Sequence, residues 1–280
     1  MRLSGPVPDL NIQDPRDYAK RTRQRGYGTI QWPNNVPMSD MQVDDLLDAL
    51  AQEDITVAEV GAWSNPISPD KSQREEAMKK CIDKLMLAER VGAKCCVNIA
   101  GSCNPEKWDG PHPKNLTPET FEQIVLSVQQ IIDAVNPTRT FYTLETMPWI
   151  APDSPESYLQ LIHAINRPAF GVHLDPVNMI NCPSRLFDTT SFLQDCFAKL
   201  GPWIKSCHAK DVIIHNGLTL HIDEAQPGQG VLDYVTFLQL AEQTDPDMPM
   251  CLEHLPDQQS YDDAARWLKQ IAQKEGVVLK

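Results

Sequence analysis

The feature that most constrains the fold is an alternation of two kinds of segment along the chain. Short segments rich in β-branched, aromatic and cysteine residues, typical of buried strands, are separated by longer segments whose apolar residues recur with a helical period. Strands that alternate with helices pair in parallel through right-handed crossovers, which predicts an α/β fold. The predicted strands cover residues 2–7, 26–32, 55–62, 94–100, 140–145, 170–175, 204–210 and 250–254.

Several predicted helices begin at a proline that follows an oxygen-bearing residue. Such a residue caps the free N–H groups of a helix, and proline at the first position loses no hydrogen bond. The pairs are Asp14–Pro15, Ser68–Pro69, Thr117–Pro118 and Ser154–Pro155. The helix after Thr117 has the clearest apolar stripe, formed by Phe121, Ile124, Val125, Val128, Ile131 and Ile132.

The number of strands favours a closed barrel over an open sheet. The 280 residues leave about 35 for each of eight strand–helix units, as a (β/α)₈ barrel requires. The alternative is a doubly wound open sheet, but the sequence has neither GxGxxG after the first strand nor GxxxxGK[ST]. Because no shift in composition marks a boundary, we expect a single TIM-barrel domain over residues 1–280.

The composition argues against several classes of partner. The chain carries 25 Lys and Arg residues against 38 Asp and Glu residues, a net charge of −13, so it would repel a phosphate backbone. No stretch reaches the roughly 20 apolar residues that span a bilayer, and the N-terminus has no apolar signal-peptide core. The eight cysteines include no CxxC pair, as expected of reduced thiols. We expect a cytoplasmic protein that binds neither nucleic acid nor membrane.

Four consecutive predicted strands end in side chains that can bind a metal, namely Glu145, Asp175, His208 and Glu253. In a parallel barrel the carboxyl ends of the strands meet at one face, where ligands and catalytic groups gather. Three carboxylates and one imidazole favour Mn²⁺ or Mg²⁺, and can also hold Co²⁺, Fe²⁺ or Zn²⁺. We therefore expect these residues to bind one divalent cation, with Mn²⁺ as the first choice.

The alternative explanation for such residues is structural. A single acidic residue or histidine at a strand end more often caps a helix or forms an ion pair. Here four of them each follow an apolar strand that should be buried, where an unpaired charge is costly. Three carboxylates brought together without a cation would also repel one another. The coincidence of four therefore favours a metal site.

The sequence around these positions resembles a known family. The motifs are His-Leu-Asp-Pro at 173–176, His-Ala-Lys-Asp at 208–211, Pro-Gly-Gln-Gly at 227–230 and Leu-Glu-His at 252–254. With the order Glu, Asp, His, Glu they resemble the xylose-isomerase-like barrel superfamily, and within it the sugar isomerase/epimerase group, which includes tagatose and psicose 3-epimerases and inosose dehydratase. The resemblance covers essentially the whole chain. It implies a (β/α)₈ TIM barrel that assembles into dimers or tetramers.

The resemblance also implies an enzyme and a mechanism. In the epimerases, one divalent ion chelates the carbonyl and a neighbouring hydroxyl of a keto sugar, and two metal-bound glutamates face opposite sides of the reacting carbon. Glu145 and Glu253 would then be the acid/base pair, while Asp175 and His208 mainly hold the metal. The predicted activity is isomerisation or epimerisation in carbohydrate metabolism, through proton abstraction next to a carbonyl and a metal-stabilised enediolate.

The sequence departs from the epimerase pattern at three positions. The epimerases have His three residues after the Asp ligand, Arg six residues after the His ligand, and a further Glu six residues after the first Glu ligand. This chain has Asn178, Ile214 and Ala151 there. The metal ligands are thus kept while the substrate shell differs. We expect the substrate to be a differently substituted keto sugar, an inosose or a sugar acid.

The candidate substrate-binding residues lie near the predicted strand ends. Lys210 shares a strand face with His208, and His173 shares one with Asp175, so both can point into the barrel mouth. Lys210 would bind a substrate oxyanion or form an ion pair with Asp211 or Glu145. His254, directly after Glu253, is expected to point away from the site. The full set predicted to bind substrate is Lys210, His173, Asn178, Trp63, Asn98 and His221.

Two further segments allow more than one interpretation. Residues 227–230 precede a predicted helix and could offer backbone N–H groups to an anion, although a tight turn explains their glycines more simply. Residues 218–224, which contain His221, could form a hairpin over the site, and the long loop 101–117 could form a lid.

Three other functions compete with an isomerase. A lyase or dehydratase would use the same site on a keto sugar, an inosose or a 3-oxo-glycoside, if a leaving group departs after the enediolate forms. An endonuclease IV-like DNA repair enzyme shares the barrel, but it needs three zinc ions and histidines from early strands, and only His112 of the seven histidines precedes residue 163. A barrel that only binds its ligand is the last alternative, against which the complete ligand set argues.

Overall fold

The computed structural model describes residues 1–7, 14–34 and 36–280, and all eight predicted strands are present in it. They form one sheet in the order β1-β10-β7-β6-β5-β4-β3-β2, with parallel neighbours. The strands are β1 (Arg2–Ser4), β2 (Thr29–Gln31), β3 (Thr56–Gly61), β4 (Cys95–Asn98), β5 (Tyr142–Glu145), β6 (Phe170–Leu174), β7 (Ile204–Ala209) and β10 (Pro249–Leu252).

Helices follow most of these strands, and a separate hairpin follows β7. The hairpin pairs β8 (Asp211–Ile214) with β9 (Ile222–Ala225) in antiparallel fashion, so the hairpin expected around residues 218–224 is present with a shifted boundary. The helices are α1 (Pro15–Gln24), α2 (Asp40–Gln52), α3 (Lys71–Val91), α4 (Pro118–Val135), α5 (Pro155–Ile165), α6 (Pro176–Met179), α7 (Pro183–Phe187), α8 (Thr189–Leu200), α9 (Tyr234–Thr244) and α10 (Gln258–Lys274).

The chain contacts divide into two compact units, which are described separately. Unit 1 comprises residues 1–58, 180–194 and 207–280, and unit 2 comprises residues 59–179 and 195–206. The expectation of a single domain stays a prediction.

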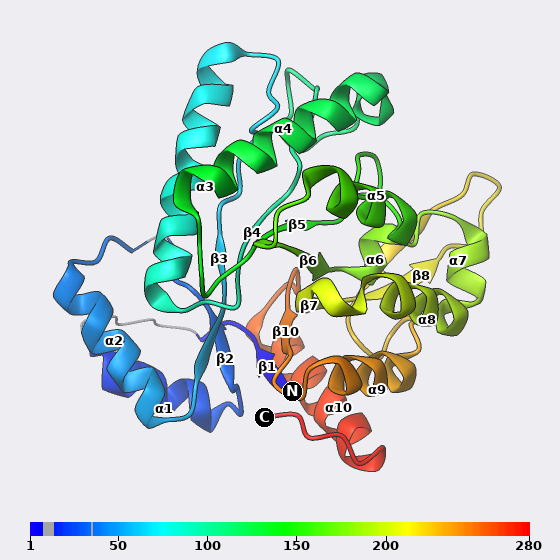
Figure 1. Cartoon of the computed structure of the whole chain (residues 1–280). Coiled ribbons are helices and arrows are strands. Elements are labelled where there is room, and N and C mark those ends of the chain that lie inside the picture. The colour runs from blue at the N-terminus through cyan, green and yellow to red at the C-terminus, as the bar shows by residue number, and fades with distance from the viewer. Residues whose placement is uncertain (8–13, 35) are drawn as a thin grey trace. The chain divides into compact units, whose positions relative to one another are not determined.

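In unit 2, strands β4 to β6 are buried along their whole length. A parallel strand buried on both faces needs helices to cover it, and α3, α4 and α5 supply that cover (Figure 1). The predicted stripe of α4 faces inward, since Ile124, Val128, Ile131 and Ile132 are buried and Phe121 and Val125 are half-buried.

In unit 1, β1 pairs with β10 and β10 pairs with β7. The N–H of Gly28, just before β2, donates to the carbonyl of Leu3 in β1 at 3.0 Å. This bond links the two strands that end the sheet order, as a barrel requires. Helices α1 and α2 lie side by side, as do α9 and α10 (Figure 1).

The start of α3 differs from the sequence prediction. The helix begins at Lys71 rather than Pro69, because the Asp70 carboxylate accepts the N–H of Gln73 at 2.8 Å and so acts as the N-cap. Ser68, the predicted cap, instead accepts the N–H of Asp70 at 3.3 Å. The caps predicted at Asp14, Thr117 and Ser154 are confirmed.

Among the described residues, no helix combines the length and the apolar character needed to cross a bilayer.

Candidate metal centre

Two of the predicted ligands lie at adjacent strand ends in unit 2. Glu145 is the last residue of β5, and Asp175 directly follows β6. Both side chains are buried, and a carboxylate oxygen of one lies within 4.8 Å of a carboxylate oxygen of the other. Two negative charges buried so close together call for a positive partner.

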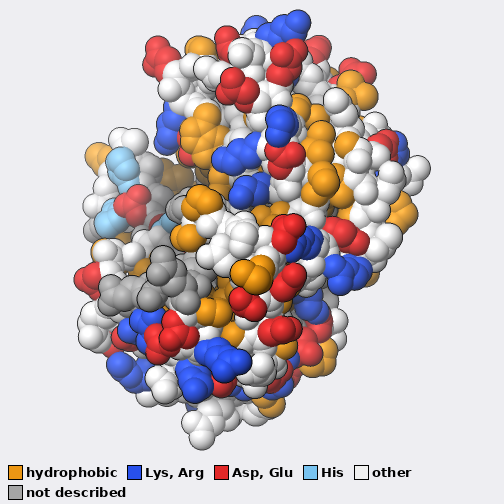
Figure 2. All heavy atoms as spheres, turned by 90° about the vertical axis from the view of Figure 1, so that its left-hand side faces the viewer, with side chains coloured by type: hydrophobic (Ala, Val, Ile, Leu, Met, Phe, Trp, Pro, Cys, Tyr) orange, Lys and Arg blue, Asp and Glu red, His pale blue; other side chains and the backbone are white. Residues whose placement is uncertain are grey.

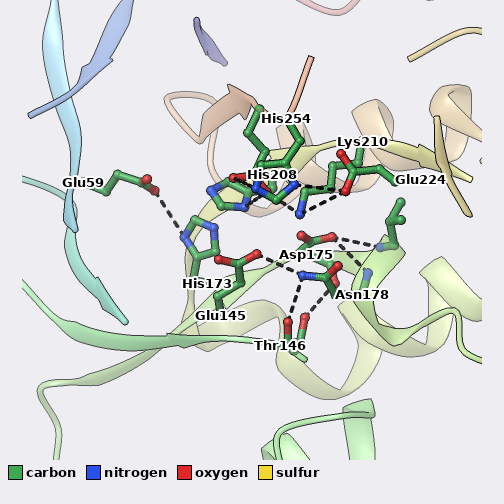
Figure 3. A network of polar contacts seen from close by, with 12 residues as sticks. Glu59, Glu145, Thr146, His173, Asp175, Asn178, His208, Lys210, Glu224 and His254 are labelled. Atoms are coloured by element: carbon green, nitrogen blue, oxygen red, sulfur yellow. Dashed lines mark hydrogen bonds and ion pairs between the residues drawn. The ribbon is translucent and has the colours of Figure 1, made fainter. Parts of the chain in front are cut away.

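Local hydrogen bonds fix the direction of both carboxylates. Asn178 donates its side-chain amide to Glu145 Oε1 at 3.0 Å and to the carbonyl of Thr146 at 3.0 Å (Figure 3). Asp175 Oδ1 accepts the N–H groups of Val177 at 3.0 Å and Asn178 at 3.2 Å, which caps the short helix α6. Asn178, predicted to bind substrate, therefore supports Glu145 in this structure.

A second buried pair in unit 2 contains a residue that the sequence analysis missed. Glu59 in β3 and His173 in β6 are 2% and 0% exposed, and Glu59 Oε2 lies 3.4 Å from His173 Nδ1 (Figure 3). The signal for Glu59 was present, because it is a lone acidic residue inside the apolar strand Thr-Val-Ala-Glu-Val-Gly. Such a residue needs a partner, and His173 provides one.

The other two predicted ligands lie together in unit 1. His208 is in β7 and Glu253 directly follows β10, the neighbouring strand. His208 Nδ1 lies 2.7 Å from Glu253 Oε1. The imidazole is fully buried, while the carboxylate is 13% exposed.

Lys210 brings a buried positive charge to the same two strand ends. Its ammonium forms an ion pair with Glu253 and lies 3.8 Å from a carboxylate oxygen of Glu224 in β9. The side chain is 1% exposed, so its charge is held by these acidic groups rather than by bulk water. Of the two roles expected for Lys210, the structure shows ion pairing, but its partners in unit 1 are Glu253 and Glu224, neither of which was predicted.

His254 does not follow the orientation expected for it. Strand alternation ends with β10 at Leu252, and His254 has a positive φ of 58°, so its ring can turn toward the hairpin. Its Nδ1 lies 3.1 Å from Glu224 Oε2, and its Nε2 lies 3.7 Å from Glu253 Oε2 (Figure 3). The hydrogen bond with Glu224 raises the pKa of His254.

The remaining predicted substrate-binding residues, Asn98, Trp63 and His221, lie in other surroundings. Asn98 is fully buried and accepts the N–H of Ser64 at 3.0 Å, while its amide donates to Cys81 Sγ and the Tyr142 hydroxyl. Its side chain therefore links α3, β5 and the segment after β3. Trp63 is 36% exposed after β3, and His221 is exposed beside β9. Their substrate contacts stay predictions.

A groove in unit 2 lies between α3 and α4. Its lining includes Met78 and Ile82 of α3, Gln123 and Leu126 of α4, and Cys103 of the loop between β4 and α4. None of the residues that line it belongs to the predicted site. The loop 101–117 is itself tied down, since Ser102 donates to the carbonyl of Gly110 at 2.6 Å.

Comparison with known proteins identifies the family. A family model described as xylose isomerase-like TIM barrel matches residues 19–271, which is most of the chain. The chain belongs to this family. The fold and the resemblance predicted from the sequence motifs are thereby confirmed. No curated protein matches the xylose isomerase-like chain in sequence.

Solved structures share the fold of this xylose isomerase-like chain at low sequence identity. The probable 3-DHS dehydratase AsbF of Bacillus anthracis has a TM-score of 0.71 and 16% identity, with 97% of this chain and 99% of that chain covered. D-psicose 3-epimerase of Clostridium cellulolyticum H10, solved with D-tagatose, has a TM-score of 0.70 and 14% identity over 98% and 99%. A xylose isomerase-like TIM barrel protein of Mycobacterium smegmatis, in complex with magnesium, has a TM-score of 0.69 and 14% identity, with 98% of this chain and 97% of that chain covered.

Proposed function

We propose that Glu145, Asp175, His208 and Glu253 bind one divalent cation in a sugar-modifying enzyme. The observation that carries this proposal is the arrangement of the ligands in two close pairs, Glu145 with Asp175 and His208 with Glu253. Their strands β5, β6, β7 and β10 are consecutive neighbours in the sheet, and neighbouring strands lie about 4.8 Å apart. Strand β7 is continuous from residue 204, in unit 2, to residue 209, in unit 1.

The donor set fits a hard cation. Three carboxylates and an imidazole supply oxygen and nitrogen atoms without thiolates, which suits Mn²⁺ or Mg²⁺ better than a soft metal. Asn178 provides the outer hydrogen bond that orients a ligating carboxylate. We propose Mn²⁺ as the physiological ion, and the magnesium in the M. smegmatis structure shows that a relative binds a hard divalent cation.

The reaction that this chemistry supports best is isomerisation or epimerisation of a keto sugar. A bound cation would polarise the carbonyl oxygen of the substrate and so acidify the neighbouring C–H. Glu145 and Glu253 come from different strands, and each would remove or return a proton at that carbon. Lys210, ion-paired with Glu253, would compensate negative charge that develops on the substrate.

A dehydratase acting on a keto sugar or inosose is the second candidate, and the buried Lys210 favours it. An ammonium beside the base Glu253 can donate a proton to a departing hydroxyl, which then leaves as water. The structural likeness to AsbF, a probable dehydratase, is consistent with this outcome.

Solvent-deuterium exchange tests the shared first step. The purified chain, loaded with Mn²⁺, is incubated in D₂O with a panel of keto sugars, inososes and 3-oxo-glycosides, and deuterium in recovered substrate and product is measured by mass spectrometry. We expect exchange at the carbon next to the carbonyl. Glu253→Gln and Glu145→Gln should each lower the rate by about 100-fold to 10,000-fold, because each removes a general acid/base.

The control variant is Glu75→Gln, an exposed acid on α3. It should exchange at the wild-type rate. Full exchange by Glu253→Gln would refute the acid/base assignment, and absence of exchange across the whole panel would refute the proposed substrate class. The products distinguish the candidates, since an epimer or isomer keeps its oxygen atoms and a dehydrated product loses one.

A further inference from the structure

The Pro227–Gly230 turn binds an anion that belongs to the protein itself. The Asp211 side chain is 1% exposed and accepts four backbone N–H groups. Its Oδ2 binds Gly228 at 2.9 Å and Gly230 at 3.0 Å, and its Oδ1 binds Val212 and Leu232, each at 2.9 Å. The N–H groups of Gly228 and Gly230 therefore already donate to a carboxylate of the same chain, so they are not available to bind a phosphate.

The glycines of this turn are required by the fit around Asp211. A Cβ at Gly230 would lie 2.2 Å from Asp211 Oδ1 and 2.5 Å from the carbonyl oxygen of Val212. Gly228 has a φ of +90°, and a Cβ there would meet the Trp267 ring at 2.7 Å. The Pro-Gly-Gln-Gly motif at 227–230 thus binds the aspartate of the His-Ala-Lys-Asp motif at 208–211, although Pro227 lies 16 positions after Asp211 in the sequence.

Lys210 lies between β7 and β8, next to the residue that these hydrogen bonds anchor. It sits between the end of β7 at Ala209 and the start of β8 at Asp211, where the chain leaves the parallel sheet for the hairpin. Its carbonyl accepts the Tyr234 hydroxyl at 2.7 Å, and the next side chain along, Asp211, is anchored by its four bonds. The pairing of Ala209 with Leu252 of β10 fixes the backbone before Lys210, and these bonds fix the backbone after it, which limits the directions its buried side chain can take.

We propose that Asp211, bound to the Pro227–Gly230 turn, is a positioning residue that holds the Lys210 ammonium against Glu253. The role of Lys210 toward substrate rests on the proposed function, but its placement by Asp211 does not. The Asp211 carboxylate binds four backbone N–H groups, so its effect on Lys210 passes through the backbone that the two neighbouring residues share. Tyr234 of α9 stabilises the same segment by donating its hydroxyl to the carbonyl of Lys210.

Trace labelling with acetic anhydride measures the placement without any assay of activity. Mass spectrometry of the folded protein reports the acetylation rate of Lys210 against Lys79, which is 77% exposed, and Lys269, which is half-buried. We expect Lys210 to react at least about tenfold more slowly than Lys79. Asp211→Asn should raise the Lys210 rate by about tenfold or more, because an amide NH₂ then faces the N–H groups of the turn, and should leave Lys269 unchanged.

Two further variants keep the test decisive. Asp233→Asn is the matched control, since Asp233 caps α9 through Thr236 and accepts the hydroxyl of Thr190 in α8, and the variant should leave Lys210 protected. Tyr234→Phe keeps the buried ring, removes only the hydroxyl, and should raise the Lys210 rate by a smaller factor. Equal rises in Asp211→Asn and Asp233→Asn, or a rise at Lys269 in step with Lys210, would overturn the proposal.

A double-mutant cycle tests the consequence for catalysis once a substrate turns over. If Asp211 acts through Lys210, the double variant Asp211→Asn, Lys210→Gln should lose no more kcat/KM than Lys210→Gln alone. Additive losses would mean that Asp211 acts on the reaction independently, and would contradict the positioning role. Absence of turnover on every substrate would refute the proposed function and leave the labelling result standing.

Discussion

At the scale of single residues, several acidic side chains accept hydrogen bonds from two or more backbone N–H groups. Asp211 and Asp175 are two cases, and Glu89 at the end of α3 is a third. Glu89 Oε1 accepts the N–H and the hydroxyl of Thr138, and Oε2 accepts the N–H groups of Arg139 and Thr140. These bonds fix the segment that leads into β5 and hence the path of the strand that carries Glu145.

The lowered pKa of Glu89 predicts that the stability of the protein depends on pH. Burial raises its pKa, but the hydrogen bonds from residues 138–140 outweigh this effect and lower the pKa to about 2 from the usual 4.5. A lowered pKa in the folded state stabilises the protein above the unfolded pKa, and this contribution is lost as the pH falls from about 4.5 toward 2. Glu89→Gln should cost about 1–2 kcal/mol at pH 7 and less near pH 3, measured by urea unfolding.

The control for this variant is Glu122→Gln, at an exposed position in α4. Its free energy of unfolding should follow the wild-type value across the same pH range. If Glu89→Gln and the wild type differed by the same amount at pH 7 and pH 3, the hydrogen bonds would not be selective for the ionised carboxylate.

The sequence identifies a site residue when its position alone makes it unusual. Glu145, Asp175, His208 and Glu253 each terminate an apolar strand, and the structure places them in two close pairs. Glu224 could not be found in this way, because it lies in the hairpin strand β9 and not at the end of a strand of the parallel sheet. The partnership of Asp211 with residues 227–230 depends on where two loops meet, which no local pattern encodes.

At the scale of secondary-structure elements, the N-cap of α3 shows which residue decides where the helix begins. Proline at residue 69 suggested Ser68 as the cap, whereas Asp70 binds the N–H of Gln73. Asp70→Ala should therefore cost about 1 kcal/mol and speed hydrogen exchange at the Gln73 amide. Ser68→Ala should leave that amide protected. If exchange at the Gln73 amide were faster in Ser68→Ala but not in Asp70→Ala, Ser68 would be the N-cap, as the sequence predicted.

The strands were predictable as elements, but their ends were not. Runs rich in β-branched, aromatic or cysteine residues mark the central strands β3, β4 and β6, because a parallel strand buried on both faces tolerates little else. Strand ends depend on hydrogen bonds with neighbours, so β1 stops at Ser4 and β2 begins only at Thr29. The hairpin of β8 and β9 begins at Asp211, directly after the predicted strand 204–210 and seven residues before the segment 218–224 in which a hairpin was expected.

At the scale of the whole molecule, charge distribution bears on the choice between functions. The chain has a net charge of −13, and the face in Figure 2 shows acidic and basic side chains interspersed, with no broad basic area on that face. A nucleic-acid enzyme concentrates positive charge where the phosphates bind. A small carbohydrate needs no such field, so this surface is consistent with a small-molecule substrate.

The proposed cation would have ligands from both units, and this predicts how metal affects thermal unfolding. Mn²⁺ at about 100 times its dissociation constant should stabilise the protein by about 2.7 kcal/mol, which raises the Tm by about 5 °C for a chain of this size. EDTA should reverse the rise. Asp175→Asn in unit 2 and His208→Gln in unit 1 should each abolish it, while Glu75→Gln should keep it. If either ligand variant kept the full rise measured by calorimetry, the cation would be held by one unit alone, and a single centre built from four consecutive strands would be excluded.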